Sequence, residues 1–408
     1  MNVTSKRPLK LALIREGKVP PDSRVALTPQ QAARVHASAD FEVRVQPSPG
    51  RCFSDDAYRA AGVPVEEDLS DCDILIGVKE VPIDQLVPDK TYFFFSHTHK
   101  EQAYNRALLQ AVISRGIRLI DYELLTDDAG DRLIAFGKFA GMVGAHHALR
   151  AWGLRTGNFE LPQMNTFTDY EAAQTAYAKT NFGQVRVVVT GTGRVGKGAV
   201  SVLRDAGLTE VTNESFLAGR GEGAVFTHLS AKHYVQRRDG KPFTKREFYA
   251  DPKAFESAFE PYTKAADVFV HGIFWDNDAP AMFTVDDMTD PAWRIQVISD
   301  VTCDIYPVTS VPATRKASTI AEPYFGFDPR QEAVTESFET KAVTMMTIDN
   351  LPNELPRDAS KAFGTMFIEK ILPELRLESS AVLDRATLTS EGALTPAWSK
   401  LEHFVSQK

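Results

Sequence analysis

The chain has 408 residues, of which 43% are hydrophobic and 25% charged, a composition typical of folded globular proteins. At about 150 residues per domain, this length predicts two or three domains. The formal net charge is −8. Because nucleic acids and anionic membranes select basic surfaces, we expect neither as a partner.

The three cysteines, Cys52, Cys72 and Cys303, are too few and too widely spaced for a disulfide framework or a zinc site. The chain has no run of about 18 apolar residues, so we expect no transmembrane helix. Its first residues, MNVTSKRPLK, lack the long apolar region of a signal peptide. We therefore expect a cytoplasmic protein with a small-molecule substrate, and the sequence leaves a homo-oligomer open.

Apolar runs alternate with helical patterns from the start of the chain to about Gly137. Thr28, Pro29 and Gln31 predict a helix start with a capping box. The expected strands are LKLALI (9–14), FEVRVQP (41–47), DILIGV (73–78), TYFFFS (91–96) and IRLIDYE (117–123). Because several of these runs are apolar on both faces, they predict a parallel sheet covered on both sides by helices.

A second unit of the same kind follows a helix expected at 137–157 and a polar hinge at 162–168. A charged segment at 229–249 interrupts this unit as an insertion. The expected strands are VRVVV (185–189), VFVHGI (268–273), RIQVISD (294–300) and AVTMMTID (342–349). The tail after Pro356 is typical of an amphipathic helix, which we expect to pack on the first unit.

The sequence therefore predicts an α/β fold of two Rossmann-like domains, each a doubly wound parallel sheet, with a cleft between them. We expect a substrate and catalytic domain at 1–145, completed by 350–408. A dinucleotide-binding domain is expected at 146–349.

The strongest local motif is a glycine-rich turn between a buried strand and a helix. Its residues are Gly191, Thr192, Gly193, Arg194, Val195 and Gly196. In this context the glycines permit a tight turn and let backbone N–H groups approach a pyrophosphate. The motif therefore predicts NAD or NADP as the cofactor.

The residue that reads the ribose should lie about 20 residues further on, at the end of the next strand. Asn213 or Glu214 occupies this place, and we select Glu214 as the candidate. No acidic residue follows an apolar strand cleanly there, so the sequence leaves the choice between NAD and NADP open.

Ionisable residues close three expected strands of the first unit: Lys79, His97 and Glu123. Ligands of open parallel sheets bind beyond the carboxyl ends of the strands, so these side chains should face one cleft. Arg24, just before the first helix, could bind a carboxylate. A lysine and a histidine in a partly dry cleft repel each other when both are charged, which lowers their pKa values towards working pH.

Other candidates are weaker. His99, His146 and His147 lack the spacing of metal ligands, because His146 and His147 point in divergent directions on one helix. We therefore predict no metal site. Cys303 has no obvious base nearby and is interpreted as a packing residue.

Ordered motifs along nearly the whole chain resemble the L-lysine-forming saccharopine dehydrogenases. These motifs are SRVALTP, GVKEVP, FFSHTHKEQ, IDYELLTDDAGDRLIAFGKFAG, VTGTGRVGKGA and MTIDNLPNELPRDAS. The chain is most similar to the lysine–ketoglutarate reductase half of the bifunctional lysine-degrading enzyme. That family belongs to the alanine dehydrogenase/transhydrogenase-like superfamily.

The resemblance implies roles for particular residues. Lys79 and His97 match the acid–base pair of the family, and Arg24 matches the arginine that binds a carboxylate. Lys100 matches a lysine near the substrate, and Glu123 matches an acid that lines the cleft. The residues that match the cofactor site are the three glycines of the turn, with Asp300, Asn350 and Leu351 beside the nicotinamide.

The resemblance implies the interconversion of saccharopine with L-lysine and 2-oxoglutarate, dependent on NAD or NADP. The alternatives are another amino-acid or opine dehydrogenase of the superfamily, or a catalytically silent regulator that binds the cofactor. The sequence leaves the direction of the reaction open.

Overall fold

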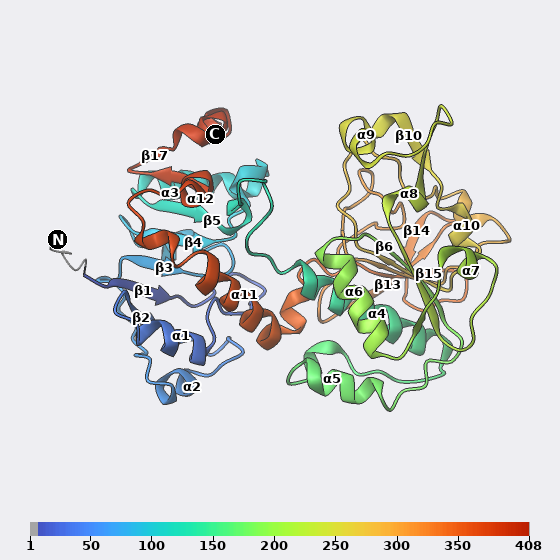
Figure 1. Cartoon of the computed structure of the whole chain (residues 1–408), viewed down its shortest axis with the longest axis horizontal. Coiled ribbons are helices and arrows are strands. Elements are labelled where there is room, and N and C mark those ends of the chain that lie inside the picture. The colour runs from blue at the N-terminus through green and yellow to red at the C-terminus, as the bar shows by residue number, and fades with distance from the viewer. Residues whose placement is uncertain (1–6, 408) are drawn as a thin grey trace. The chain divides into compact units, whose positions relative to one another are not determined.

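The computed structural model describes residues 7–407 (Figure 1). Residues 1–6, on which part of the signal-peptide expectation rests, and residue 408 lie outside the described residues. The chain forms two compact units, Met1–Ala135 with Pro356–Lys408, and Phe136–Leu355. The expected boundary at residue 145 would divide helix α4 (Gly137–Thr156), which belongs as a whole to the second unit because it packs on helix α6 of that unit.

The first unit contains a seven-stranded sheet in the order β17-β16-β5-β4-β3-β1-β2. Strands β2 to β5 and β1 are parallel, while β16 and β17 add an antiparallel edge that the sequence did not predict. The strands are β1 (Leu9–Leu13), β2 (Phe41–Val45), β3 (Ile74–Ile76), β4 (Thr91–Phe94), β5 (Arg118–Asp121), β16 (Thr387–Ser390) and β17 (Ala393–Leu394). The helices are α1 (Pro29–His36), α2 (Asp55–Ala60), α3 (Arg106–Ser114), α11 (Pro356–Lys370), α12 (Ala381–Ala386) and α13 (Glu402–Ser406).

Both faces of this sheet are covered, because successive side chains of β4 point to opposite sides. Tyr92 and Phe94 belong to the core that also contains buried residues of α3 and α13. Phe93 packs edge-on against Phe367 of α11, with ring centroids 5.8 Å apart. The tail helix α11 therefore packs on the first unit.

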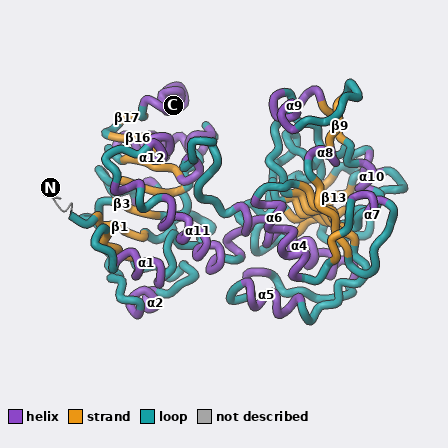
Figure 2. Tube along the Cα trace, in the orientation of Figure 1, coloured by secondary structure: helices purple, strands orange, loops and turns teal. Residues whose placement is uncertain are grey.

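The second unit contains an eight-stranded sheet in the order β14-β13-β15-β12-β11-β6-β8-β7, seen as the orange strands of Figure 2. Six strands of this sheet are parallel: β7, β8, β6, β11, β12 and β15. β13 and β14 form an antiparallel edge. The strands are β6 (Arg186–Thr190), β7 (Thr209–Glu210), β8 (Val225–Leu229), β11 (Val268–His271), β12 (Val297–Asp300), β13 (Tyr324–Asp328), β14 (Ala333–Thr335) and β15 (Val343–Met346). The helices are α4, α5 (Tyr170–Tyr177), α6 (Arg194–Asp205), α7 (Asn213–Leu217), α8 (Ala231–Tyr234), α9 (Lys245–Ala250) and α10 (Glu260–Thr263).

Glycines let α4 approach α6 closely. A Cβ at Gly141 of α4 would lie 1.8 Å from the carbonyl oxygen of Val195, and one at Gly198 of α6 would lie 2.0 Å from that of Lys138. The opposite face of the sheet packs on an aromatic core that includes Phe269. The charged segment contains α8, β9 (Val235–Arg237) and most of α9, and β9 pairs antiparallel with β10 (Phe255–Ser257), which follows the segment.

The prediction of an α/β fold with two parallel-sheet domains is confirmed, and each sheet gains antiparallel strands at one edge. Among the described residues, no helix combines the length and apolar character needed to span a bilayer.

Candidate active site and cofactor turn

The carboxyl ends of β3, β4 and β5 meet at one edge of the first sheet, because these strands are parallel neighbours. Lys79 lies three residues beyond β3, His97 three residues beyond β4, and Glu123 two residues beyond β5. The structure thus brings the three predicted residues to the same edge, as the sequence suggested.

Lys79 is partly buried, and its Nζ forms no hydrogen bond or ion pair with a described residue. Burial, followed by the charges of Arg24 and Lys18, lowers the pKa of Lys79. Its backbone N–H donates to Oε2 of Glu16 (2.8 Å), while the N–H of Val78 donates to Oε1 (2.6 Å). These bonds fix the backbone at the end of β3, from which the Lys79 side chain projects.

Glu16 adds little negative charge to this site. Burial raises the pKa of Glu16 to about 8, against the opposing effect of the two backbone N–H groups. The carboxyl group is therefore mostly protonated at neutral pH, and it does not hold a proton on Lys79 by charge attraction.

His97 forms a hydrogen bond between Nδ1 and Oε1 of Glu80, 2.7 Å apart, and Lys18 Nζ lies 3.0 Å from Oε2. Burial opposes ionisation of Glu80, but the hydrogen bond and charge of His97, with Lys18, lower the pKa of Glu80 to about 2. Because an ionised carboxylate only accepts, Nδ1 of His97 carries a proton and Nε2 is left to exchange one. The ring also stacks on Phe95, at a centroid distance of 6.3 Å.

Asp121 holds the turn that carries His97. Its Oδ2 accepts the N–H groups of Ser96 (2.9 Å) and His97 (3.2 Å), and its Oδ1 accepts the N–H of Glu123 (2.7 Å). Burial alone would raise the pKa of Asp121, but the interactions with His99 and Ser96 lower it. His97 has a left-handed backbone conformation (φ 55°), which this network stabilises.

Glu123 is surrounded by cations. Lys100 Nζ lies 3.0 Å from its Oε2, and Arg132 forms an ion pair with its Oε1. His99, Asp121 and Glu123 also place one potential metal ligand each within 4.8 Å of one another. Lys100 and Arg132 already neutralise the charge of Glu123. We therefore interpret the cluster as a group that holds Lys100 at the sheet edge, and not as a metal site.

Arg24 is buried and forms a bidentate ion pair with Asp22, through Nε (2.9 Å) and Nη2 (2.6 Å). The predicted carboxylate fork is thus turned onto a carboxylate of the chain itself. Its charge still reaches Lys79, whose pKa it helps to lower.

The glycine-rich turn of the second unit joins β6 to α6. Gly191 has φ 97°, and a Cβ there would lie 2.2 Å from the carbonyl oxygen of Gly272. A Cβ at Gly196 would lie 1.6 Å from the carbonyl oxygen of Gly191, whereas one at Gly193 would meet no heavy atom within 4 Å. Two glycines are therefore needed for the close turn, and the third leaves open space in front of the helix start. This arrangement fits the pyrophosphate of a dinucleotide.

The other residues of the turn differ in exposure. Thr192 and Arg194 are exposed, and Arg194 begins α6. Val195 is half-buried, and its Cγ1 lies 2.7 Å from the position that a Cβ of Gly272 would take.

The remaining cofactor candidates lie further from the turn. Asp300 ends β12 and is buried; its oxygens accept hydrogen bonds from Thr302 Oγ1 and Thr314 Oγ1, both 2.6 Å. Burial raises the pKa of Asp300. Asn350 and the buried Leu351 follow β15 at the start of a short 3-10 helix. Asp300 and Leu351 therefore shape the loops at this sheet edge from within.

Glu214 is exposed in the first turn of α7, beyond β7. β7 is the edge strand of the sheet, and β8 lies between it and β6. Glu214 thus does not follow the strand next to β6.

Two histidines beside the glycine-rich turn were not predicted as site residues. His228 Nε2 donates to the carbonyl oxygen of Gly191 (2.7 Å), and His271 joins Thr190 Oγ1 to Ser310 Oγ (2.8 Å each). Burial lowers the pKa of His271 to about 3, so its ring is neutral. The sequence signal for both was their place at strand ends beside the turn.

Cys303 and the paired histidines have structural roles. The Cys303 thiol donates to the carbonyl oxygen of Thr347 (3.0 Å), and burial, with the charge of Asp300, raises its pKa to about 12. His146 contacts Tyr177 and His147 contacts Glu354, each at 2.8 Å.

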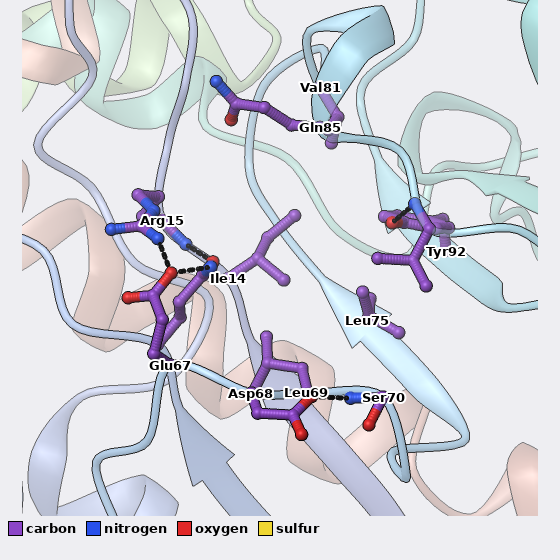
Figure 3. A pocket seen from close by; sticks show the side chains of 12 residues that line it. Ile14, Arg15, Glu67, Asp68, Leu69, Ser70, Leu75, Val81, Gln85 and Tyr92 are labelled. Atoms are coloured by element: carbon purple, nitrogen blue, oxygen red, sulfur yellow. Dashed lines mark hydrogen bonds and ion pairs between the residues drawn. The ribbon is translucent and has the colours of Figure 1, made fainter.

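A hollow of about 480 Å³ lies on the first unit, away from these residues (Figure 3). It is lined by Ile14, Arg15, Gln46, Glu67, Asp68, Leu69, Ser70, Leu75, Val81, Gln85, Val87 and Tyr92. Arg15 forms an ion pair with Glu67 across its rim. None of the candidate catalytic residues lines it.

Comparison with known proteins identifies the chain's relatives and its fold. Residues 12–143 match the family described as alanine dehydrogenase/PNT, N-terminal domain. The chain is 28% identical to a saccharopine dehydrogenase [NAD(+), L-lysine-forming] of Emericella nidulans, over 89% of this chain and 90% of that protein. The chain is similar to saccharopine dehydrogenases over most of its length. The resemblance drawn from the motifs is confirmed.

A longer relative is the alpha-aminoadipic semialdehyde synthase of Arabidopsis thaliana, 30% identical over 92% of this chain. The chain spans 39% of the length of that protein. A solved L-alanine dehydrogenase matches 98% of this chain with a TM-score of 0.68 and 16% identity, which supports the fold.

Proposed function

We propose that the chain is an NAD(P)-dependent dehydrogenase acting on a CH–NH group, which interconverts saccharopine with L-lysine and 2-oxoglutarate. The observation that carries the proposal is the arrangement at the edge of the first sheet. There, Lys79, whose amine has a lowered pKa, precedes Glu80 in the sequence, and the carboxylate of Glu80 binds Nδ1 of His97. The names of the relatives supply the substrate.

Oxidation of a secondary amine requires a group that removes its proton. Lys79 suits this task, because its lowered pKa increases the fraction of free amine at neutral pH. The nicotinamide, when bound, accepts the hydride from the carbon next to the nitrogen. The substrate then becomes an imine, and Lys79 holds the proton that it removed.

Hydrolysis of the imine requires a second proton carrier. His97 can take a proton from the attacking water at Nε2, since Glu80 keeps Nδ1 protonated. The imine nitrogen takes back the proton that Lys79 holds, and Nε2 of His97 returns the proton of water to the same nitrogen as the carbon–nitrogen bond breaks. Lys79, again a free amine, accepts the proton of the carbinolamine hydroxyl as the carbonyl group forms. The products are then L-lysine and 2-oxoglutarate, with one hydride transferred and one water consumed.

The substrate carboxylates require cations. Lys100 is 42% exposed at its side chain while remaining paired to Glu123, so its ammonium can contact a further carboxylate. Arg24, already paired with Asp22, contributes its charge to the same edge of the sheet.

The assay mixes the protein with lysine, 2-oxoglutarate and NADH or NADPH and follows the nicotinamide absorbance. Consumption that depends on both lysine and 2-oxoglutarate supports the proposal. Consumption with pyruvate and ammonia, but not with lysine and 2-oxoglutarate, would instead identify an alanine-type dehydrogenase. Absence of turnover with every pair would contradict the proposed function.

A further inference from the structure

Lys100 is carried by a short turn between two residues in the left-handed conformation. The turn is a single 3-10 helix, Thr98–Lys100, preceded by His97 (φ 55°) and followed by Glu101 (φ 57°). Such backbone angles are unfavourable for residues other than glycine, so contacts with the surrounding structure must hold them. Asp121 binds one end of the turn through the N–H of His97. The other end, Glu101, is bound by a distant segment of the chain.

The distant segment, residues 395–406, is anchored in the core of the first unit. It forms a 3-10 turn and helix α13. Leu401 and Phe404 are buried in the same core as residues of α3 and β4. Gln110 of α3 also donates to the carbonyl oxygen of Val405 (2.7 Å). Because these contacts do not involve the turn, they fix the segment independently of it.

Two side chains of this segment contact the residues on either side of Lys100. The ring of Trp398 meets the ring of His99 edge-on, at a centroid distance of 6.2 Å. Nε2 of His403 lies 2.8 Å from Oε2 of Glu101. The residue before Lys100 and the residue after it are thus both held, while the Lys100 side chain itself stays accessible.

Trp398 and His403 are themselves fixed by backbone carbonyl groups. Nε1 of Trp398 donates to the carbonyl oxygen of Arg385 (3.0 Å), and Nδ1 of His403 donates to that of Lys400 (2.7 Å). A carbonyl oxygen and a carboxylate only accept hydrogen bonds, so both ring nitrogens of His403 carry a proton in this arrangement. The imidazolium therefore binds the carboxylate of Glu101 through a charge-assisted hydrogen bond.

From these contacts we infer that segment 395–406 positions Lys100 to bind a carboxylate of 2-oxoglutarate. Trp398 and His403 are the positioning residues, because they act through the two neighbours of Lys100. The inference rests on the proposed function, in which Lys100 contacts a substrate carboxylate. 2-Oxoglutarate is a dianion that an ammonium group attracts, whereas L-lysine carries a net positive charge. The expected effect is therefore on the binding of 2-oxoglutarate.

His403 allows this role to be separated from stability. The side chains of His403 and Glu101 are 61% and 38% exposed, and exposed ion pairs contribute little to stability. His403→Ala should therefore fold normally. Trp398 also packs on the core of the first unit, so its replacement affects both positioning and stability.

The test is steady-state kinetics with L-lysine, 2-oxoglutarate and NADH or NADPH, with thermal unfolding in parallel. His403→Ala should raise the KM for 2-oxoglutarate by about 5-fold or more and leave kcat and the KM of the dinucleotide within about 2-fold. His403→Gln, whose amide can still donate to Glu101, should recover most of this loss. The matched control is Glu402→Ala, an exposed neighbour on α13, which should change none of these constants.

Coupling between variants separates positioning from a general effect of substitution. Glu101→Ala should raise the KM for 2-oxoglutarate as His403→Ala does, and the double variant should match either single variant, because all three lack the same contact. Trp398→Leu should raise this KM as well. Trp398→Phe keeps an aromatic ring against His99 and should raise it less.

An unchanged KM for 2-oxoglutarate in His403→Ala, or additive effects of His403→Ala and Glu101→Ala, would overturn the inference and leave the proposed function intact. A fall in kcat without a change in this KM would also overturn it, because binding would then be unaffected. If the unmodified protein turns over no substrate pair, the proposed function fails, and calorimetric titration with glutarate decides the inference. Glutarate binding weakened about 5-fold by His403→Ala would then support the inference, whereas unchanged or absent binding would overturn it.

Discussion

Gly193 offers a sharp test of the cofactor turn, because its position is open and its backbone is unstrained. No heavy atom lies within 4 Å of a Cβ placed there, and its φ is −79°. Gly193→Asp should therefore fold normally. Its carboxylate would project into the space that we assign to the pyrophosphate.

The expected effect follows from the charge. At about 4 Å and an effective dielectric constant of about 20, a carboxylate and a phosphate repel by about 4 kcal/mol, or about a thousandfold in affinity. Gly193→Asn has nearly the same shape without the charge and separates steric from electrostatic loss. It should weaken binding less than Gly193→Asp.

The assay is a titration of NADPH and NADH monitored by nicotinamide fluorescence, with thermal unfolding of the free protein in parallel. An unchanged dissociation constant in Gly193→Asp, with an unchanged unfolding temperature, would refute the assignment of the turn. A lowered unfolding temperature would contradict the open space at Gly193.

Three further outcomes are expected. Lys79→Met and His97→Gln should each lower turnover by about 100-fold or more with little change in cofactor affinity, measured by steady-state kinetics and titration; near-full activity of both would remove them from the mechanism. Glu80→Gln should destabilise the fold by about 3 kcal/mol at neutral pH, since the pKa of Glu80 falls from 4.5 to about 2. The stability that Glu80 contributes is present above the pKa of the unfolded state and is lost as pH falls from about 4.5 towards 2. Denaturant unfolding should therefore show the free energies of unfolding of the unmodified protein and of Glu80→Gln converging in this pH range. A difference that stays constant with pH would contradict the role of Glu80. Gly198→Ala should lower the unfolding temperature clearly, because its Cβ would lie 2.0 Å from the carbonyl oxygen of Lys138, whereas Gly193→Ala should not.

Much of the fold was predictable because the strands of parallel sheets are apolar on both faces. The runs that end before Lys79 and His97 were recognised in this way, and so was the strand before the glycine turn. The antiparallel strands β16 and β17 were not predicted, because short edge strands lack such a pattern. The pairing of β16 with β5 depends on contacts across more than 250 residues of chain.

The sequence predicted the residues of the candidate site that follow the strands, but it did not predict the residues to which they bind. Glu80 follows Lys79 directly, and Asp121 precedes Glu123 by two residues, so both were visible as ionisable neighbours. That Glu80 binds the ring of His97 depends on the side-by-side placement of β3 and β4. The pairing of Arg24 with Asp22 was likewise not predicted.

Strand order was the most misleading feature to infer from spacing. Glu214 was chosen by its distance along the chain, which assumes that consecutive strands are neighbours. The insertion of β8 between β6 and β7 breaks that assumption, since hydrogen bonding between distant segments sets the order.

The division of the first unit has a consequence for synthesis on the ribosome. Phe93 and Tyr122 pack against Phe367 of α11, and β5 pairs with β16. When Ala135 has been made, these partners do not yet exist, whereas Phe136–Leu355 forms one continuous stretch. The first unit must therefore wait, with an uncovered aromatic surface, until the segment Pro356–Lys408 emerges, and the second unit can reach its final form before it.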